Sequence, residues 1–174
     1  MAVIGWGKPR IVFKDLDASA PKWEEAPTPV QDSTQLTPTK GDKTEAKLEG
    51  GANEDVKYNK HTYALTFNIR KAKGRKCPIP HSDGVVAHNY AIALQPEDPE
   101  VPGIAMEKCT VSVEDSWSSS EGGIWAITFD ALQPESGNQV KDGVIAITGS
   151  GDSITSVTIT PEGESDPEEV APSA

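Results

Sequence analysis

Cysteine is scarce in this 174-residue chain, which contains only Cys77 and Cys109. Two thiols do not form the disulfide framework that holds small secreted domains together. The first ten residues lack the apolar stretch of a secretory signal, and no apolar run approaches the roughly 18 residues of a membrane-spanning helix. These absences lead us to expect a protein that is made and retained in a cytoplasm and has no membrane anchor.

A helical pattern is also missing, because no stretch of about eleven residues carries an apolar stripe with a period of 3.6. Thr, Ser, Val, Ile, Gly and Pro are plentiful instead. Short segments with strand-like patterning are separated by turn signals, and they cover residues 7–16, 33–49, 56–69, 85–94, 109–113, 124–132, 143–148 and 153–160. The sequence therefore predicts an all-β fold, an antiparallel β-sandwich or barrel, formed by one domain over residues 1–162.

Catalytic signatures are absent too. The chain contains no P-loop, dinucleotide fingerprint, nucleophile elbow or zinc-ligand spacing. Cys77, His81 and His88 have suitable side chains for a metal or a Cys/His pair, but no other Cys or His lies at the spacing of a zinc site. The adjacent acids at 97–98 and 114–115 fit solvated turns better than an acid–base pair. We expect no enzyme, no cofactor and no metal.

Cations are too few for stable nucleic-acid binding, since the formal net charge is −11. Residues 151–174 contain six carboxylates and no Lys or Arg, and we expect the acidic tail at 163–174 to be disordered. The exception is the stretch 70–76, with five cations in seven residues. No aromatic residue is interleaved with these charges, so the stretch fits a solvated strand end or loop better than a nucleic-acid patch.

An extended N-terminal arm is predicted at residues 18–30. Pro21, Pro27 and Pro29 prevent a continuous strand ladder there, so the arm should lie over a surface. Trp6 and Trp23 have two interpretations: they cap the core of the domain itself, or they anchor an adjacent subunit, as interface aromatics often do.

A long polar hairpin is predicted at residues 41–61, with its break at 50–53. Before the break, charged and small or apolar residues alternate, and after it the alternation resumes at Val56 and sharpens from Tyr63. A two-stranded hairpin is marginal in water, so a projecting one indicates a partner surface. The residues we expect at contacts between subunits are Glu45, Lys47, Glu49, Asn53, Glu54, Asp55, Lys57 and Lys60 in the hairpin, with Trp6 and Trp23 in the arm.

The order of three segments, 29–75, 83–103 and 111–132, resembles the major tail tube protein of long-tailed bacteriophages. The resemblance implies a β-sandwich that forms hexameric rings, which stack into a tube through which the genome leaves. It also implies that the hairpin at 41–61 is the stacking element. The implied partners are further copies of the chain and the tape measure, tail terminator and baseplate proteins, in a virion tail assembled in the host bacterial cytoplasm.

DNA passing through such a tube should interact with the protein only transiently, because carboxylates do not hold phosphates. Glu45, Glu49 and Asp55 lie near strand ends that could line the lumen. Two other functions stay open. One is a tube protein of a contractile injection system, with an effector protein as cargo, and the other is a monomeric immunoglobulin-like or carbohydrate-binding sandwich in which the four tryptophans supply a sugar platform.

Overall fold

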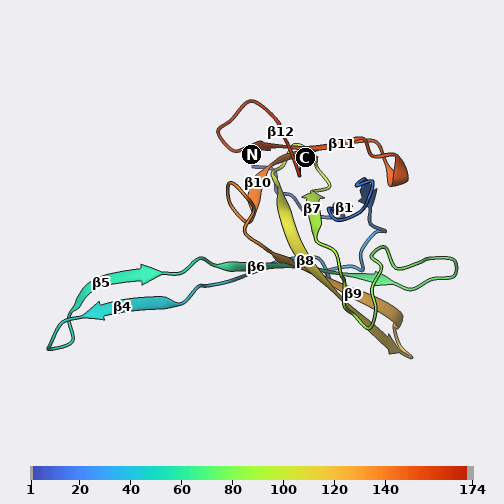
Figure 1. Cartoon of the computed structure of the whole chain (residues 1–174). Helices are drawn as coiled ribbons and strands as arrows, with labels where there is room; N and C mark the ends of the chain where they lie inside the picture. The colour runs from blue at the N-terminus through green and yellow to red at the C-terminus, as the bar shows by residue number, and fades with distance from the viewer. Residues whose placement is uncertain (1, 172–174) are drawn as a thin grey trace.

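The computed structural model describes residues 2–171 and has an all-β, antiparallel architecture, as predicted (Figure 1). No α-helix occurs among these residues. The elements in chain order are β1 Arg10–Asp15, β2 Trp23–Glu25, β3 Gln35–Thr39, β4 Lys43–Lys47, β5 Asn53–Tyr58, β6 Thr62–Arg70, β7 Tyr90–Gln95, β8 Gly103–Ser118, β9 Gly122–Ala131, β10 Lys141–Thr148, the short 3-10 helix η1 Gly151–Ser153, β11 Ser156–Pro161 and β12 Glu168–Glu169.

Strand β8 connects the parts of the main sheet, because three strands pair with it. Residues 103–105 pair with β10, residues 104–109 with β7, and residues 109–118 with β9. From these partners the sheet continues through β11 to β12, through β1 to β2, and through β6 to β3. The sheet does not close on itself, so the body is an open, folded-over sandwich rather than a barrel.

Two hydrophobic cores lie on opposite faces of β1 and β7. Ile11 and Phe13 point into the first core, with residues of β6, β8 and β9, whereas Val12 points into the second, with residues of β10 and β11. Residues 11–14 and 90–93 are each buried without interruption. Both faces of these strands are therefore covered, which differs from the half-buried strand that the alternation over 85–94 indicated.

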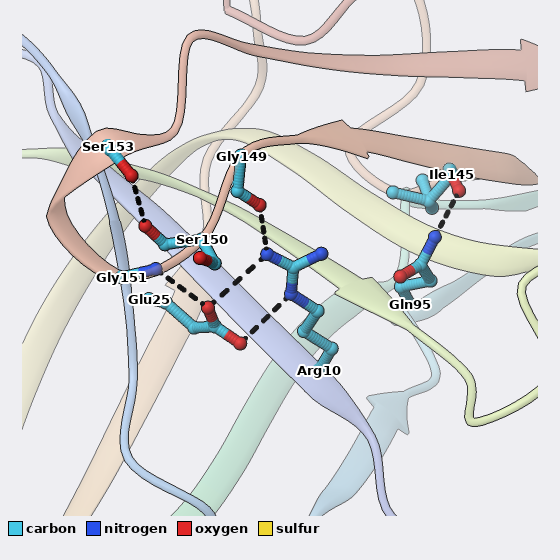
Figure 2. Close-up of polar contacts among 8 residues, drawn as sticks. All are labelled: Arg10, Glu25, Gln95, Ile145, Gly149, Ser150, Gly151 and Ser153. Carbon is cyan, nitrogen blue, oxygen red and sulfur yellow. Dashed lines mark hydrogen bonds and ion pairs between the residues drawn. The ribbon is translucent and has the colours of Figure 1, made fainter.

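Polar contacts fasten the β10–β11 region to the strands beneath it (Figure 2). Arg10 Nε donates to Glu25 Oε1 at 2.9 Å, and the backbone N of Gly151 donates to Glu25 Oε2 at 3.0 Å. The Arg10 hydrogen bond holds the pKa of Glu25 below its usual value. Gln95 Nε2 donates to the carbonyl of Ile145 at 2.7 Å. Charged and amide side chains thus position the turn that carries η1.

The predicted acidic tail is partly ordered, which corrects the expectation of disorder. Strand β12 pairs with β11, and Val170 follows it into the second core with 1% of its surface exposed. Lys14 Nζ donates to the carbonyl of Ala171 at 3.0 Å. Burial of two apolar side chains, those of Val170 and Ala171, and pairing with the free edge of β11 hold residues 168–171 on the body. Residues 172–174 lie outside the described residues.

The predicted arm at 18–30 contains strand β2, which pairs with β1. Pro21 and Pro27 flank it and limit the ladder to a short piece. Trp23 is 4% exposed and belongs to the second core, so the core interpretation is confirmed for this residue. Its indole is not accessible to an adjacent subunit, and the expected contact at Trp23 is wrong. Trp6, in contrast, is 74% exposed.

The predicted strand at 85–94 begins only at Tyr90. The preceding loop is held by two carboxylates, with His88 Nδ1 at 2.7 Å from Asp15 Oδ2 and the backbone N of Asn89 donating to Asp17 Oδ2 at 2.8 Å. The second contact engages a backbone N–H that a continuing strand would have directed into a ladder. The loop is therefore an anchored connection rather than an extension of β7.

Candidate assembly surface at the β4–β5 hairpin

The β4–β5 hairpin projects from the body as a separate two-stranded sheet (Figure 1). Every residue of β5 is exposed, and no residue from 42 to 62 is buried. A pair of strands without a third strand or a covered face gains little stability on its own. Such an element is typical of a segment that a partner surface completes.

The root of the hairpin is a narrow neck between the β3–β6 ladder and the β4–β5 ladder. The backbone N of Asn59 donates to the carbonyl of Asp42 at 2.9 Å. At Gly41, an added Cβ would lie 2.2 Å from the carbonyl oxygen of Asn59, so only glycine permits this approach. Lys40 Nζ lies 4.7 Å from the ring centroid of Tyr58, in a cation–π contact. The neck thus holds the two chains close together where they leave the body.

A bulge interrupts the hairpin near its end. Ala46 pairs with Asp55, but Lys47 pairs with Asn53, which leaves Glu54 outside the pairing. An extra residue of this kind bends its strand and re-aims the side chains beyond it. The bulge therefore gives Glu54 a direction that regular alternation would not.

The turn at the end depends on two glycines. Gly50 and Gly51 both have positive φ angles, 91° and 88°, which side chains rarely permit. The backbone N of Leu48 donates to the carbonyl of Ala52 at 2.8 Å and closes the loop. Nothing lies within 4 Å of a Cβ built on either glycine, so the turn is free in solvent.

Charges on the hairpin are unevenly distributed. Glu45 contacts both Lys43 and Lys47, and the Lys43 hydrogen bond lowers the pKa of Glu45 while raising that of Lys43. The negative charge of Glu45 in the middle of the hairpin is therefore compensated by the two lysines. Residues 48–55, which we call the hairpin tip, contain Glu49, Glu54 and Asp55 without a Lys or Arg, a formal charge of −3. The end that lies farthest from the body is acidic.

The structure brings most of the predicted contact residues together. Glu45, Lys47, Glu49, Asn53, Glu54, Asp55 and Lys57 lie on the hairpin. Lys60 lies at the root, where its Nζ donates to Gln133 Oε1 of the body at 3.0 Å. Trp6 and Trp23 do not join this group, since Trp6 belongs to the N-terminal segment and Trp23 to the second core.

Three apolar residues of the hairpin were not predicted as contact residues. Leu48 is 52% exposed, Val56 37% and Tyr58 49%. Val56 pairs with Glu45 and Tyr58 with Lys43, so these two share a face of the hairpin. Their spacing of two in the sequence was a signal for that shared face. The hairpin thus offers apolar surface as well as charge.

The cysteine and histidine side chains lie in different environments. Cys109 is buried, and desolvation raises the pKa of its thiol to about 12. His81 contacts Asp115 Oδ2 at 3.1 Å and the carbonyl of Ile79 at 3.3 Å. Within residues 2–171, no three His, Cys, Asp or Glu side chains are grouped so that they could hold a metal ion. That part of the chain also contains no helix with the length and apolarity to cross a membrane.

Comparison with known proteins does not assign this chain to a family. No family model matches the sequence, and no curated protein is significantly similar to it. The functional argument therefore depends on the geometry of the hairpin and the body that carries it.

Proposed function

We propose that this protein is a structural subunit that self-assembles into hexameric rings, and that the rings stack into a phage tail tube for genome delivery. The observation that carries the proposal is the β4–β5 hairpin, which projects from the body with both faces exposed. The resemblance of residues 29–75 and two later segments to tail tube proteins points the same way. Copies of the chain would supply the surface that the hairpin lacks.

Free strand edges on the body also favour assembly. Among the described residues, β2, β3 and β12 each pair along one edge only. An unpaired edge promotes uncontrolled association unless an ordered partner covers it. Lateral head-to-tail contacts that close into a ring cover such edges, and axial contacts of the same kind allow open growth.

The hairpin is long enough to reach a neighbouring ring. The eleven residues 40–50, at about 3.3 Å per residue, span about 35 Å. That is about the diameter of a small domain. A tip at this distance from its own body would reach the next copy along a stack.

In the proposed function, the subunit would work with the tape measure, tail terminator and baseplate proteins in a virion tail assembled in the host cytoplasm. DNA would pass the lumen without stable binding. This role requires no catalytic group, cofactor or membrane anchor. A contractile injection system would use the same subunit design with an effector protein as cargo.

The test removes the hairpin and keeps the body. Residues 43–58 are replaced by Asn-Gly, a two-residue turn that would join Asp42 to Asn59, whose backbones are already hydrogen-bonded. We expect concentrated wild-type protein to form rings and tubes in negative-stain electron micrographs. The variant should form no tubes, while its circular dichroism spectrum and unfolding midpoint stay close to those of the wild type.

Tubes formed by the hairpin-deleted variant would contradict the proposal. A wild-type protein that stays monomeric at high concentration and binds glycans would favour the carbohydrate-binding alternative instead. Fewer tryptophans are accessible to a sugar than the sequence suggested, because Trp23 and Trp125 are buried in the cores. A sugar platform would have to use Trp6 and Trp117, which are 74% and 75% exposed.

A further inference from the structure

Strand β6 joins two projecting segments of opposite charge. Before β6 comes the hairpin with its acidic tip, and β6 ends at Arg70, the first residue of a stretch that we call the basic loop, residues 70–76. Five of these seven residues are Lys or Arg. Figure 1 shows the hairpin and the loop after β6 extending from opposite sides of the body. One strand therefore connects an acidic projection to a basic one.

Most of the charge in the basic loop is uncompensated. Lys71 pairs with Asp115 at 2.9 Å and lies 5.5 Å from the ring centroid of Trp125. Within residues 2–171, no ion pair is recorded for the other four cations, and every residue from 70 to 76 is exposed. Arg70 Nη1 donates to the carbonyl of Glu121 and Arg75 Nη1 to that of Arg70, both at the backbone, so these bonds position the cations without neutralising them.

The acids of the hairpin tip are equally uncompensated. No ion pair is recorded for Glu49, Glu54 or Asp55 in the part of the chain that the structure describes. Asp55 Oδ1 accepts a hydrogen bond from the backbone N of Val56 at 2.8 Å. Because β6 separates the tip from the basic loop, the two cannot meet within one chain. Each is accessible to a partner of opposite charge from outside the chain.

We propose that the hairpin tip of one subunit docks on the basic loop of the next copy along the stack. This inference rests on the proposed function and names the surface that receives the hairpin. The contact is head-to-tail and joins different surfaces, so it leaves a free tip at one end and a free loop at the other, and growth continues. Charge complementarity sets the direction and register of that contact more than its affinity.

An exposed aromatic ring lies beside the basic loop and gives the contact an apolar component. The backbone N of Lys71 donates to the carbonyl of Gly123 at 2.8 Å, and Gly123 pairs with Trp117 across the β8–β9 hairpin. Trp117 is 75% exposed, and Leu48 of the tip is 52% exposed. Specific interfaces combine an apolar centre with a polar rim, which this arrangement of ring, side chain and charges can supply.

The test is a charge swap in the full-length chain. A tip variant carries E49K, E54K and D55K, and a loop variant carries K73E, R75E and K76E. In each variant alone, tip and loop have the same sign, and we expect the association constant to fall about 100-fold or more. An equimolar mixture should recover association, because every tip then finds a loop of opposite charge. Sedimentation velocity and electron microscopy provide the measurements.

A matched control reverses three acids outside both surfaces, in the variant E162K, E164K and D166K, at positions that are also exposed. We expect it to assemble like the wild type. Raising the ionic strength should weaken wild-type association and the rescued mixture alike, since exposed charges are screened.

Several results would overturn the docking proposal. Wild-type-like tubes formed by the tip variant alone and by the loop variant alone would refute the docking surface. They would leave the tube function standing. Recovery in the mixture as filaments without rings or a lumen would support the docking and refute the tube. A third result would make nucleic acid the occupant of the basic loop. In that case the wild type would bind a short DNA duplex, the loop variant would not, and the loop variant would sediment like the wild type.

Discussion

At the scale of the residue, the consecutive strands β5 and β6 contain aromatic rings in two very different environments. Phe67 has no exposed surface and stacks on Phe129, with 5.9 Å between ring centroids, whereas Tyr58 is 49% exposed. We expect Phe67→Ala to lower the free energy of unfolding by about 3–5 kcal/mol, because it leaves a cavity in the first core. Tyr58→Ala should cost about 1 kcal/mol or less.

Urea unfolding of the two variants followed by circular dichroism checks this difference. Both substitutions remove an aromatic ring, so each serves as the control for the other. Equal losses of stability would mean that the hairpin is packed against the body in solution, contrary to its exposure here.

His88 gives the protein a pH-dependent contact. Its hydrogen bond with Asp15 raises the pKa of His88 above the usual value of about 6.5. A raised folded-state pKa means that the contact stabilises the fold below the unfolded pKa and that this contribution is lost as the pH rises through the folded pKa. The stability difference between the wild type and His88→Gln should therefore be larger near pH 6 than near pH 8.5.

Thermal unfolding midpoints of both proteins at the two pH values provide the measurement. His61→Gln is the matched control, because His61 is exposed at the hairpin root and has no recorded ion pair within residues 2–171. A stability difference for His88→Gln that did not change with pH would show that Asp15 does not stabilise the charged imidazole.

At the scale of the element, the hairpin should open far more readily than the strands of the body. Amides of β4 and β5 have no third strand and no buried side chain above them, whereas β8 and β9 share the longest ladder and the first core. In dilute, unassembled protein, hydrogen exchange in residues 43–58 should be close to that of an unfolded chain, and exchange in 109–113 should be the slowest.

Hydrogen-exchange mass spectrometry checks this, and the hairpin-deleted variant identifies the relevant peptides. Slow exchange in the hairpin of a dilute monomer would contradict the view that it lacks a partner surface. Assembly should slow the exchange of the same residues.

The hairpin could be predicted from the sequence because its evidence is local. The glycines at 50–51 and the charged alternation on both sides specify two strands and a turn, whatever the rest of the chain does. The bounds of the middle strands could not be predicted in the same way. Residues 11–14 and 90–93 are buried on both faces, and the alternation over 85–94 continues past the start of β7 at Tyr90. The tail was misjudged because its docking depends on only two apolar residues, Val170 and Ala171, in an acidic context.

The candidate site was predictable to the same extent. Glu49 and Asp55 are exposed on a local element, so their placement follows from the pattern alone. Trp23 was ambiguous because an aromatic residue beside prolines suits a core and an interface equally, and only the distant residues of β10 and β11 decide between them. The pairing that leaves Glu54 unpaired depends on a bulge, which alternation does not reveal.

At the scale of the whole molecule, charge should keep DNA from binding stably. The net charge is −11, and five of the sixteen Lys and Arg residues lie in residues 70–76. Non-specific DNA-binding proteins reach dissociation constants of about 10⁻⁴ to 10⁻⁶ M at physiological salt. We expect a short duplex to bind this protein more weakly than about 10⁻⁴ M in an electrophoretic mobility shift.

Lower salt should strengthen any residual binding, and the loop variant should remove it. A tight complex at physiological salt would contradict the proposal of a lumen that releases its cargo. The control with E162K, E164K and D166K reports the effect of net charge alone.

Strand β6 also has a mechanical consequence. It is one continuous strand from Thr62 to Arg70, with Leu65, Phe67 and Ile69 buried and with ladders to β3 and β9 on its two sides. Because the hairpin precedes β6 and the basic loop follows it, tension between the two proposed contacts would pass through the covalent backbone of β6. The ladders to β3 and β9 lie beside this path and do not carry the load, so that a stretched stack would part between copies before any copy unravelled.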